Sequence, residues 1–248
     1  MIDAAELGAW AERFGVSSAQ ISRDHFLSHI LRALGDRDPN ARFFGGTALC
    51  RTLLDGSRLS EDIDLLHREP REYLTALRDA LPNALRREFP DTTWSDTIPD
   101  GDGLGCSLAA PSSAPMKIYV GRDGPNTDAW EFIPTAVQLR YSDLPAVQEF
   151  QCPTPATFAA MKLSAWSDRR APRDLFDLAG LAAAGILQEP DVERIVTAMW
   201  GHAISAADID QLPSLTTDAW ETELRAQVGS LPSADECMDQ VRQALESA

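Results

Sequence analysis

The feature that most constrains the fold is a change of residue pattern near residue 150. Before it, short strand candidates alternate with helices and with turns rich in Gly, Pro, Asp and Ser. After the segment Cys152-Pro153-Thr154-Pro155, the spacing of apolar residues is helical. The chain is therefore predicted to have an α+β fold, with a mixed α/β core over residues 1–150 and a helical domain over residues 151–248.

The spacing of apolar residues and turn residues also predicts the individual elements. In the first part, we expect helices over residues 18–34, 47–54 and 70–89. Strands are expected there over residues 42–45, 63–66, 92–98, 104–110, 116–120 and 130–139. In the second part, helices are expected over residues 156–170, 173–184, 189–201, 216–228 and 233–246.

The charge and hydropathy of the chain narrow the classes of function. Its 22 basic and 38 acidic residues give a net charge of -16, which argues against a protein that coats nucleic acid. An enzyme of this charge could still bind one end of a nucleic acid in a local basic cleft, since residues 162–174 carry four basic residues and two acidic ones. No run of 18 apolar residues and no basic signal sequence is present, so we expect a cytoplasmic protein without membrane contact.

Two acidic residues stand out at the start of the second predicted strand. Asp62 and Asp64 flank Ile63, and alternation along a strand places both carboxylates on one face with Ile63 toward the core. Two adjacent carboxylates repel each other unless a cation lies between them. Mg²⁺ fits, because it takes hard oxygen ligands and bridges substrate phosphates. We therefore predict that Asp62 and Asp64 bind magnesium.

A glycine turn precedes these acids. Gly45 and Gly46 permit close backbone approach, and Thr47 at the following helix could cap that helix or donate its hydroxyl to a phosphate oxygen. Arg58 and Ser60 add hydrogen-bond donors just before the acidic pair. We predict that these five residues bind a nucleoside triphosphate; the P-loop pattern is absent.

These two motifs resemble a known family. Phe44-Gly45-Gly46-Thr47-Ala48-Leu49, followed by Arg58-Leu59-Ser60-Glu61-Asp62-Ile63-Asp64-Leu65, is similar to the first motif of the AbiEii/MenT family. That family comprises nucleotidyltransferase-like toxins of bacterial toxin–antitoxin systems, within the DNA polymerase β-like superfamily. The resemblance covers residues 41–180 and implies a nucleotidyltransferase core with a mixed sheet.

A second motif follows in the predicted helical domain. Lys162 and Arg169 share a helix face, Pro172 suits the first turn of the next helix, and Asp174 and Asp177 follow. This pattern could simply be a set of salt bridges between helix ends. It also resembles the later AbiEii/MenT motif, which implies that Lys162 contacts the triphosphate and that Asp174 orients Lys162 or the attacking hydroxyl. Asp177 would have a secondary part, and the helical domain would contribute to the active-site cleft.

The sequence departs from the superfamily pattern in one respect. Enzymes of this superfamily commonly carry a third carboxylate on a central strand. The predicted strand over residues 116–120 offers Lys117 and Tyr119 on one face and no acid. Asp123 lies beyond the strand, and Glu131 is no better placed. The site is therefore expected to use two carboxylates, with Asp174 as a possible base.

Three functions are compatible with these motifs. The first is a toxin that transfers a nucleotide to the 3′ end of tRNA, stops translation and is restrained by an antitoxin. The second is a nucleotidyltransferase acting on a protein or on a small molecule such as an aminoglycoside, which the acidic charge would attract. The third is a non-catalytic nucleotide-binding module. The resemblance favours the first.

A pair of histidines lies outside both motifs. His25 and His29 are four residues apart on a predicted helix and therefore share a face. They could form half of a metal site, but no third ligand lies near them in the sequence. We interpret them as an ordinary helical pair.

Overall fold

The computed structural model describes residues 2–202 and 216–247. The chain divides into two compact units. The first, which we call the sheet unit, comprises Met1–Thr127 and Phe132–Cys152; the second, the helical unit, comprises Asp128–Glu131 and Pro153–Ala248. Residues 203–215 of the predicted helical domain lie outside the described residues. The predicted fold class is confirmed, because a mixed sheet with helices is followed by a helical part.

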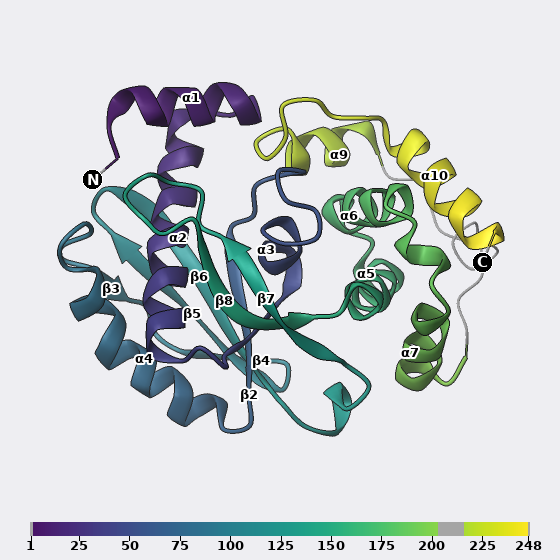
Figure 1. The fold of residues 1–248 in the computed structure, drawn as a ribbon, viewed down its shortest axis with the longest axis horizontal. Helices are drawn as coiled ribbons and strands as arrows, with labels where there is room; N and C mark the ends of the chain where they lie inside the picture. Colours follow the sequence, from purple (N-terminus) through teal and green to yellow (C-terminus); the bar gives the residue numbers. More distant parts are fainter. Residues whose placement is uncertain (1, 203–215, 248) are drawn as a thin grey trace. The chain divides into compact units, whose positions relative to one another are not determined.

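The sheet unit is built on a mixed eight-stranded sheet (Figure 1). Its strand order is β3-β5-β6-β2-β1-β8-β7, and β4 pairs with β5. β2 runs antiparallel to β1 and parallel to β6. The strands are β1 (Arg42–Phe44), β2 (Asp62–His67), β3 (Thr93–Trp94), β4 (Ile98–Asp100), β5 (Gly103–Ala110), β6 (Ser113–Arg122), β7 (Phe132–Gln138) and β8 (Val147–Pro153).

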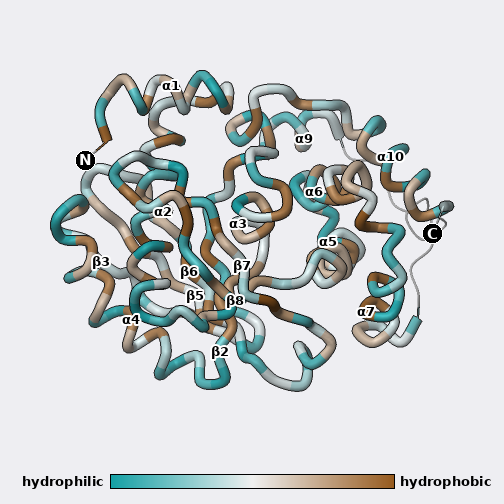
Figure 2. The backbone as a smooth tube through the Cα atoms, viewed as in Figure 1, coloured by the Kyte–Doolittle hydropathy of each residue, from teal (hydrophilic) through white to brown (hydrophobic). Residues whose placement is uncertain are grey.

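Helices cover the sheet and bury its apolar side chains. Ser17 caps α2 (Ser18–Arg37), and this helix packs with α4 (Pro70–Leu85) against β6. The short α3 (Gly45–Cys50) lies against β1 and β2. Hydrophobic residues, brown in Figure 2, follow the central strands, where Ile63 and Leu65 are fully buried. No helix of the described part of the chain is long and apolar enough to cross a membrane.

Two elements of the sheet unit have no predicted counterpart, and the single strand predicted over residues 92–98 is instead two short strands, β3 and β4. Helix α1 (Ala4–Phe14) packs on α2 through a small cluster that joins Phe14 to Ile21, Leu59 and Tyr141. Strand β8 carries glutamine and glutamate between its apolar residues, and only its second half is buried. For β8, the paired strand β1 is distant in sequence, so the local pattern is weak. Helix α1 does carry local signals, since Asp3 caps its start and Gly15 ends it.

The helical unit consists of helices that mostly begin at proline. α5 (Pro155–Arg169), α6 (Pro172–Ala183) and α7 (Pro190–Trp200) each place a proline in the first turn, where no backbone N–H is needed. α9 (Thr217–Leu224) and α10 (Ala234–Glu246) both pack on α6, which also packs on α5. A capping box of Ser233 and Glu236 begins α10. The predicted helices of this unit are thus present with small shifts of their ends.

A buried ionic network holds the elements of the sheet unit together. Asp24 of α2 is 2% exposed and pairs with Arg51, at 2.8 Å, and with Arg140, at 3.3 Å. The Tyr141 hydroxyl donates to the same carboxylate at 2.8 Å. Burial raises the pKa of Asp24, but the two arginines outweigh burial and hold it below its usual value. The network joins α2 to the end of α3 and to the β7–β8 connection.

We predict that Asp24→Ala lowers the free energy of unfolding by at least about 3 kcal/mol, because it leaves two buried guanidinium groups without their shared carboxylate. The matched control is Asp36→Ala on the same helix. Asp36 is half exposed and pairs only at the surface with Arg32, so its loss should cost less than about 1 kcal/mol. Urea unfolding followed by circular dichroism measures both, and equal losses would contradict the assignment.

Candidate active site

The predicted carboxylate pair lies on β2 as its alternation requires. Asp62 and Asp64 are partly exposed, whereas Ile63 between them is buried, so both carboxylates lie on the face opposite Ile63. The pairing register sets Asp64 beside Phe44 of β1 and beside Tyr119 of β6. The acids therefore lie at the beginning of a central strand, next to the end of β1.

The glycine turn contacts this pair directly. Gly45 follows β1 at φ +76°, a backbone conformation that favours glycine. A Cβ atom added at Gly45 would lie only 2.0 Å from Oδ2 of Asp64. No side chain could fit there without displacing the carboxylate. The turn and the acids, which are separate in the sequence, form one site because β1 and β2 are neighbours.

Three further predicted residues, Thr47, Arg58 and Ser60, lie next to this turn. The Thr47 hydroxyl is hydrogen-bonded to that of Ser60 at 2.8 Å and also contacts the carbonyl oxygen of Asp62. Thr47 is therefore neither a helix cap nor an exposed donor, and it is 1% exposed. Arg58, equally buried, donates to the Leu59 carbonyl oxygen at 3.0 Å. These side chains fasten α3 to the start of β2.

Arg58 also lies close to the second glycine. A Cβ atom at Gly46 would be 2.8 Å from Nη2 of Arg58 and 3.4 Å from Oγ of Ser60. The guanidinium thus brings positive charge close to the glycine turn. The sequence motif contains these residues, but their burial could not be deduced from their spacing.

Both candidates for a third carboxylate are paired with arginines. Asp123 lies beyond the far end of β2, where its backbone N–H donates to the His67 carbonyl oxygen and Arg42 donates to its side chain at 2.6 Å. Glu131 belongs to the helical unit and pairs with Arg194 at 2.7 Å. Each acid is already held by an arginine.

The strand beside the pair carries Lys117 and Tyr119, in register with Asp62 and Asp64. The Tyr119 hydroxyl donates to Asp102 at 3.1 Å. Burial, Asp102 and Asp64 together raise the pKa of this phenol, so it stays protonated. Asp102, in the turn between β4 and β5, therefore adds negative charge near the site. The sequence alone does not show this, because it depends on the pairing of β6 with β2 and β5. Among the described residues, Asp62 and Asp64 belong to no group of three potential metal ligands whose donor atoms all lie within 4.8 Å of one another.

The second motif forms a buried ion cluster in the helical unit. Lys162 of α5 pairs with Asp174 at 3.0 Å and with Asp177 at 2.7 Å, and both acids belong to α6. Arg169 donates two hydrogen bonds to Asp174, at 2.7 and 3.0 Å. Both acids are fully buried, whereas Arg169 is half exposed. The shared face of Lys162 and Arg169 and the place of Asp174 in the first turn are as the sequence predicts.

The burial and the ion pairs of Asp174 can be compared with what a general base requires. Burial raises the pKa of Asp174, but Lys162 and Arg169 outweigh burial and hold it below its usual value. A general base works best with a pKa near the working pH and needs access to the proton that it removes. Asp174 has neither property, so it fits the role of holding Lys162 in place.

The carboxylates on β2 fit a divalent metal. Asp62 and Asp64 offer two hard oxygen donors on one face and remain partly exposed, whereas Asp123 and Asp174 are occupied by basic side chains. Mg²⁺ typically uses one or two carboxylates and completes its shell with water and substrate phosphates. A two-carboxylate site therefore suits magnesium bound together with a triphosphate.

Comparison with solved structures supports the fold. The chain resembles MenT4, a nucleotidyltransferase toxin from Mycobacterium tuberculosis H37Rv, with a TM-score of 0.74 and 18% identity over 99% of this chain and 89% of that one. It also resembles an H. pylori protein solved as a candidate nucleotidyltransferase, with a TM-score of 0.57 and 19% identity over 93% and 95% of the two chains. At these identities the likeness shows a shared fold.

Comparison with protein families and curated proteins gives one match. No curated protein matches the chain. The family described as "Nucleotidyl transferase AbiEii toxin, Type IV TA system" matches residues 26–247, which include the β2 carboxylates, the glycine turn and the α5–α6 ion cluster. The chain therefore belongs to the AbiEii family of nucleotidyltransferase toxins from type IV toxin–antitoxin systems.

Proposed function

We propose that the protein transfers a nucleotide from a nucleoside triphosphate to the 3′ end of tRNA, with magnesium, and thereby inhibits translation. The observation that carries the proposal is the contact between the Gly45 turn and Asp64, which unites a close backbone approach with a metal-binding carboxylate. Membership of a toxin–antitoxin family implies a nucleotide substrate and a cognate antitoxin partner. The tRNA acceptor comes from the family resemblance.

The site residues predicted in the sheet unit have distinct roles in this proposal. Asp62 and Asp64 hold the metal, and the Gly45-Gly46 backbone lets the phosphates approach. Thr47, Arg58 and Ser60 hold the turn in position from its buried side. Thr47 and Arg58 are themselves buried, and Thr47 is hydrogen-bonded to Ser60. Bound magnesium would neutralise charge on the triphosphate. The acceptor hydroxyl forms a bond to the α-phosphorus, the bond to pyrophosphate breaks, and the hydroxyl proton passes to solvent.

The helical unit supplies positive charge for the same substrate. Lys162 is the basic group that the family resemblance assigns to the triphosphate, and two carboxylates hold it in place. Asp174 and Asp177 thus act as positioning residues. Arg169 is half exposed and keeps Asp174 paired if Lys162 turns toward a phosphate. We propose, from the family resemblance, that Lys162 contacts the triphosphate.

The transfer reaction is tested by incubating the protein with each labelled nucleoside triphosphate, magnesium and total tRNA. We expect label on tRNA with wild type and a loss of at least about a hundredfold with Asp64→Asn, because a metal ligand is removed. The control is Asp123→Asn, which changes an acid just after β6, outside the proposed site, and should leave transfer intact. Full activity in Asp64→Asn would refute the role of this carboxylate.

The label also identifies the acceptor. The alternative acceptors, a protein mixture and an aminoglycoside, are tested in parallel. The net charge of -16 favours the aminoglycoside among them, because an acidic protein attracts a cationic molecule. Label on either of these and none on tRNA would replace the proposed acceptor. Triphosphate binding without label on any acceptor would instead indicate a binding module.

A second prediction concerns the glycine turn. Gly45→Ala should reduce nucleotide transfer by about a hundredfold, because the added Cβ displaces the Asp64 carboxylate and misplacement of about 1 Å can cost that much. Gly56→Ala is a matched control, since Gly56 has φ +80° and no atom within 4 Å of an added Cβ. Both variants carry similar backbone strain. Equal activities in the two variants would contradict the proposed role of the turn.

A further inference from the structure

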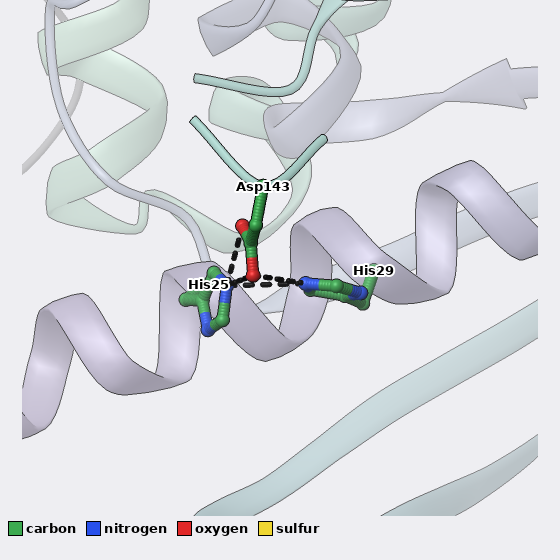
Figure 3. A group of neighbouring side chains, drawn as sticks. All are labelled: His25, His29 and Asp143. Carbon is green, nitrogen blue, oxygen red and sulfur yellow. Dashed lines mark hydrogen bonds and ion pairs between the residues drawn. The ribbon is translucent and has the colours of Figure 1, made fainter. Parts of the chain in front are cut away.

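Helix α2 and the β7–β8 connection bring two histidines and an aspartate together, away from the nucleotide site. His25 and His29 lie one turn apart on α2, and Asp143 lies in the connection between β7 and β8, within the same unit (Figure 3). Among the described residues, this is the one group of three possible metal ligands whose donor atoms lie within 4.8 Å of one another. Asp143 is the third ligand that the sequence does not reveal, because it lies more than a hundred positions away.

The three side chains converge through the atoms that would bind a metal. Nε2 of His25 lies 3.1 Å from Nε2 of His29 and 3.2 Å from Oδ2 of Asp143. Nε2 of His29 lies 3.4 Å from Oδ2 of Asp143. A tetrahedral zinc ion bound at about 2.0–2.1 Å separates its ligand atoms by about 3.3 Å. The observed triangle therefore has the dimensions of one face of a tetrahedral zinc site.

Hydrogen bonds alone satisfy this triangle poorly. A neutral imidazole carries one N–H, and if both Nε2 atoms carried it, two hydrogens would meet between His25 and His29. If only one carried it, that single hydrogen would serve both the other imidazole and Asp143. A cation accepts a lone pair from all three atoms at once. We propose that His25, His29 and Asp143 form a zinc-binding site that fastens α2 to the β7–β8 connection.

The surroundings suit such a site. His25 is buried, and the side chains of His29 and Asp143 are 11% and 13% exposed, which leaves room for a water as fourth ligand. The Phe89 ring contacts both imidazoles, with centroids at 5.6 and 5.3 Å.

Neighbouring contacts suggest what the metal would stabilise. Tyr141 and Arg140, just before Asp143, are bound to Asp24 on α2, next to His25. Ser142 is bound to Glu6 of α1 through its backbone N–H at 2.8 Å. The proposed zinc would add a further link where α1, α2 and the β7–β8 connection meet. Its role is structural and separate from nucleotide transfer.

The test uses the full chain, stripped with a chelator, reloaded with zinc and dialysed. Elemental analysis should give about one zinc per chain for wild type, and the zinc should raise the thermal unfolding temperature. His29→Gln and Asp143→Asn should lose both effects. His202→Gln, which changes an exposed histidine of the helical unit, and the double variant Asp62→Asn/Asp64→Asn should keep both.

Cobalt substitution in the wild-type chain tests the geometry without any variant. Co²⁺ bound at this site should give the intense visible absorption of a tetrahedral complex, displaced by zinc. The proposal is overturned if wild type retains no stoichiometric zinc, if His29→Gln retains it, or if the cobalt spectrum is that of an octahedral ion. None of these measurements depends on nucleotide transfer, so the two proposals can fail separately.

Discussion

The contact between Gly45 and Asp64 is the constraint on which the arrangement of the site depends. β1 ends at Phe44, which pairs with Asp64, so the chain must turn immediately beside a carboxylate. Only a residue without a side chain fits there, and its positive φ turns the chain into α3. Burial of Thr47 and Arg58 then fastens α3 to the start of β2. A glycine turn and two carboxylates are thereby held together by backbone pairing.

Charge is handled differently in the two units. On β2, Asp62 and Asp64 lie partly exposed and suit a cation supplied with the substrate. In the helical unit, Asp174 and Asp177 are fully buried and neutralised by the basic side chains of the chain itself. Removing one partner from such a buried cluster lowers the stability of the fold, because the remaining charged groups stay buried without compensation. The same residue type is therefore a candidate metal ligand in one place and a support for Lys162 in the other.

The sequence was sufficient where local patterns determine structure. The alternation at Asp62-Ile63-Asp64, the proline that begins α6 and the shared face of Lys162 and Arg169 all follow from short-range geometry. It was insufficient where distant segments meet. Strand β8, the burial of Arg58 and the approach of Asp143 to the histidines depend on tertiary contacts that no local spacing encodes.

The central claim is the proposal that Asp62 and Asp64 hold the metal of a metal–triphosphate complex and that Lys162 contacts a triphosphate. Electron paramagnetic resonance of Mn²⁺, titrated into the full chain with a non-hydrolysable triphosphate, measures this binding directly. The account predicts that triphosphate-dependent Mn²⁺ binding is lost in Asp62→Asn/Asp64→Asn and weakened in Lys162→Met. Arg173→Met, which removes a basic group of the next helix, α6, should bind as wild type does. Unchanged binding in either of the first two variants would contradict it.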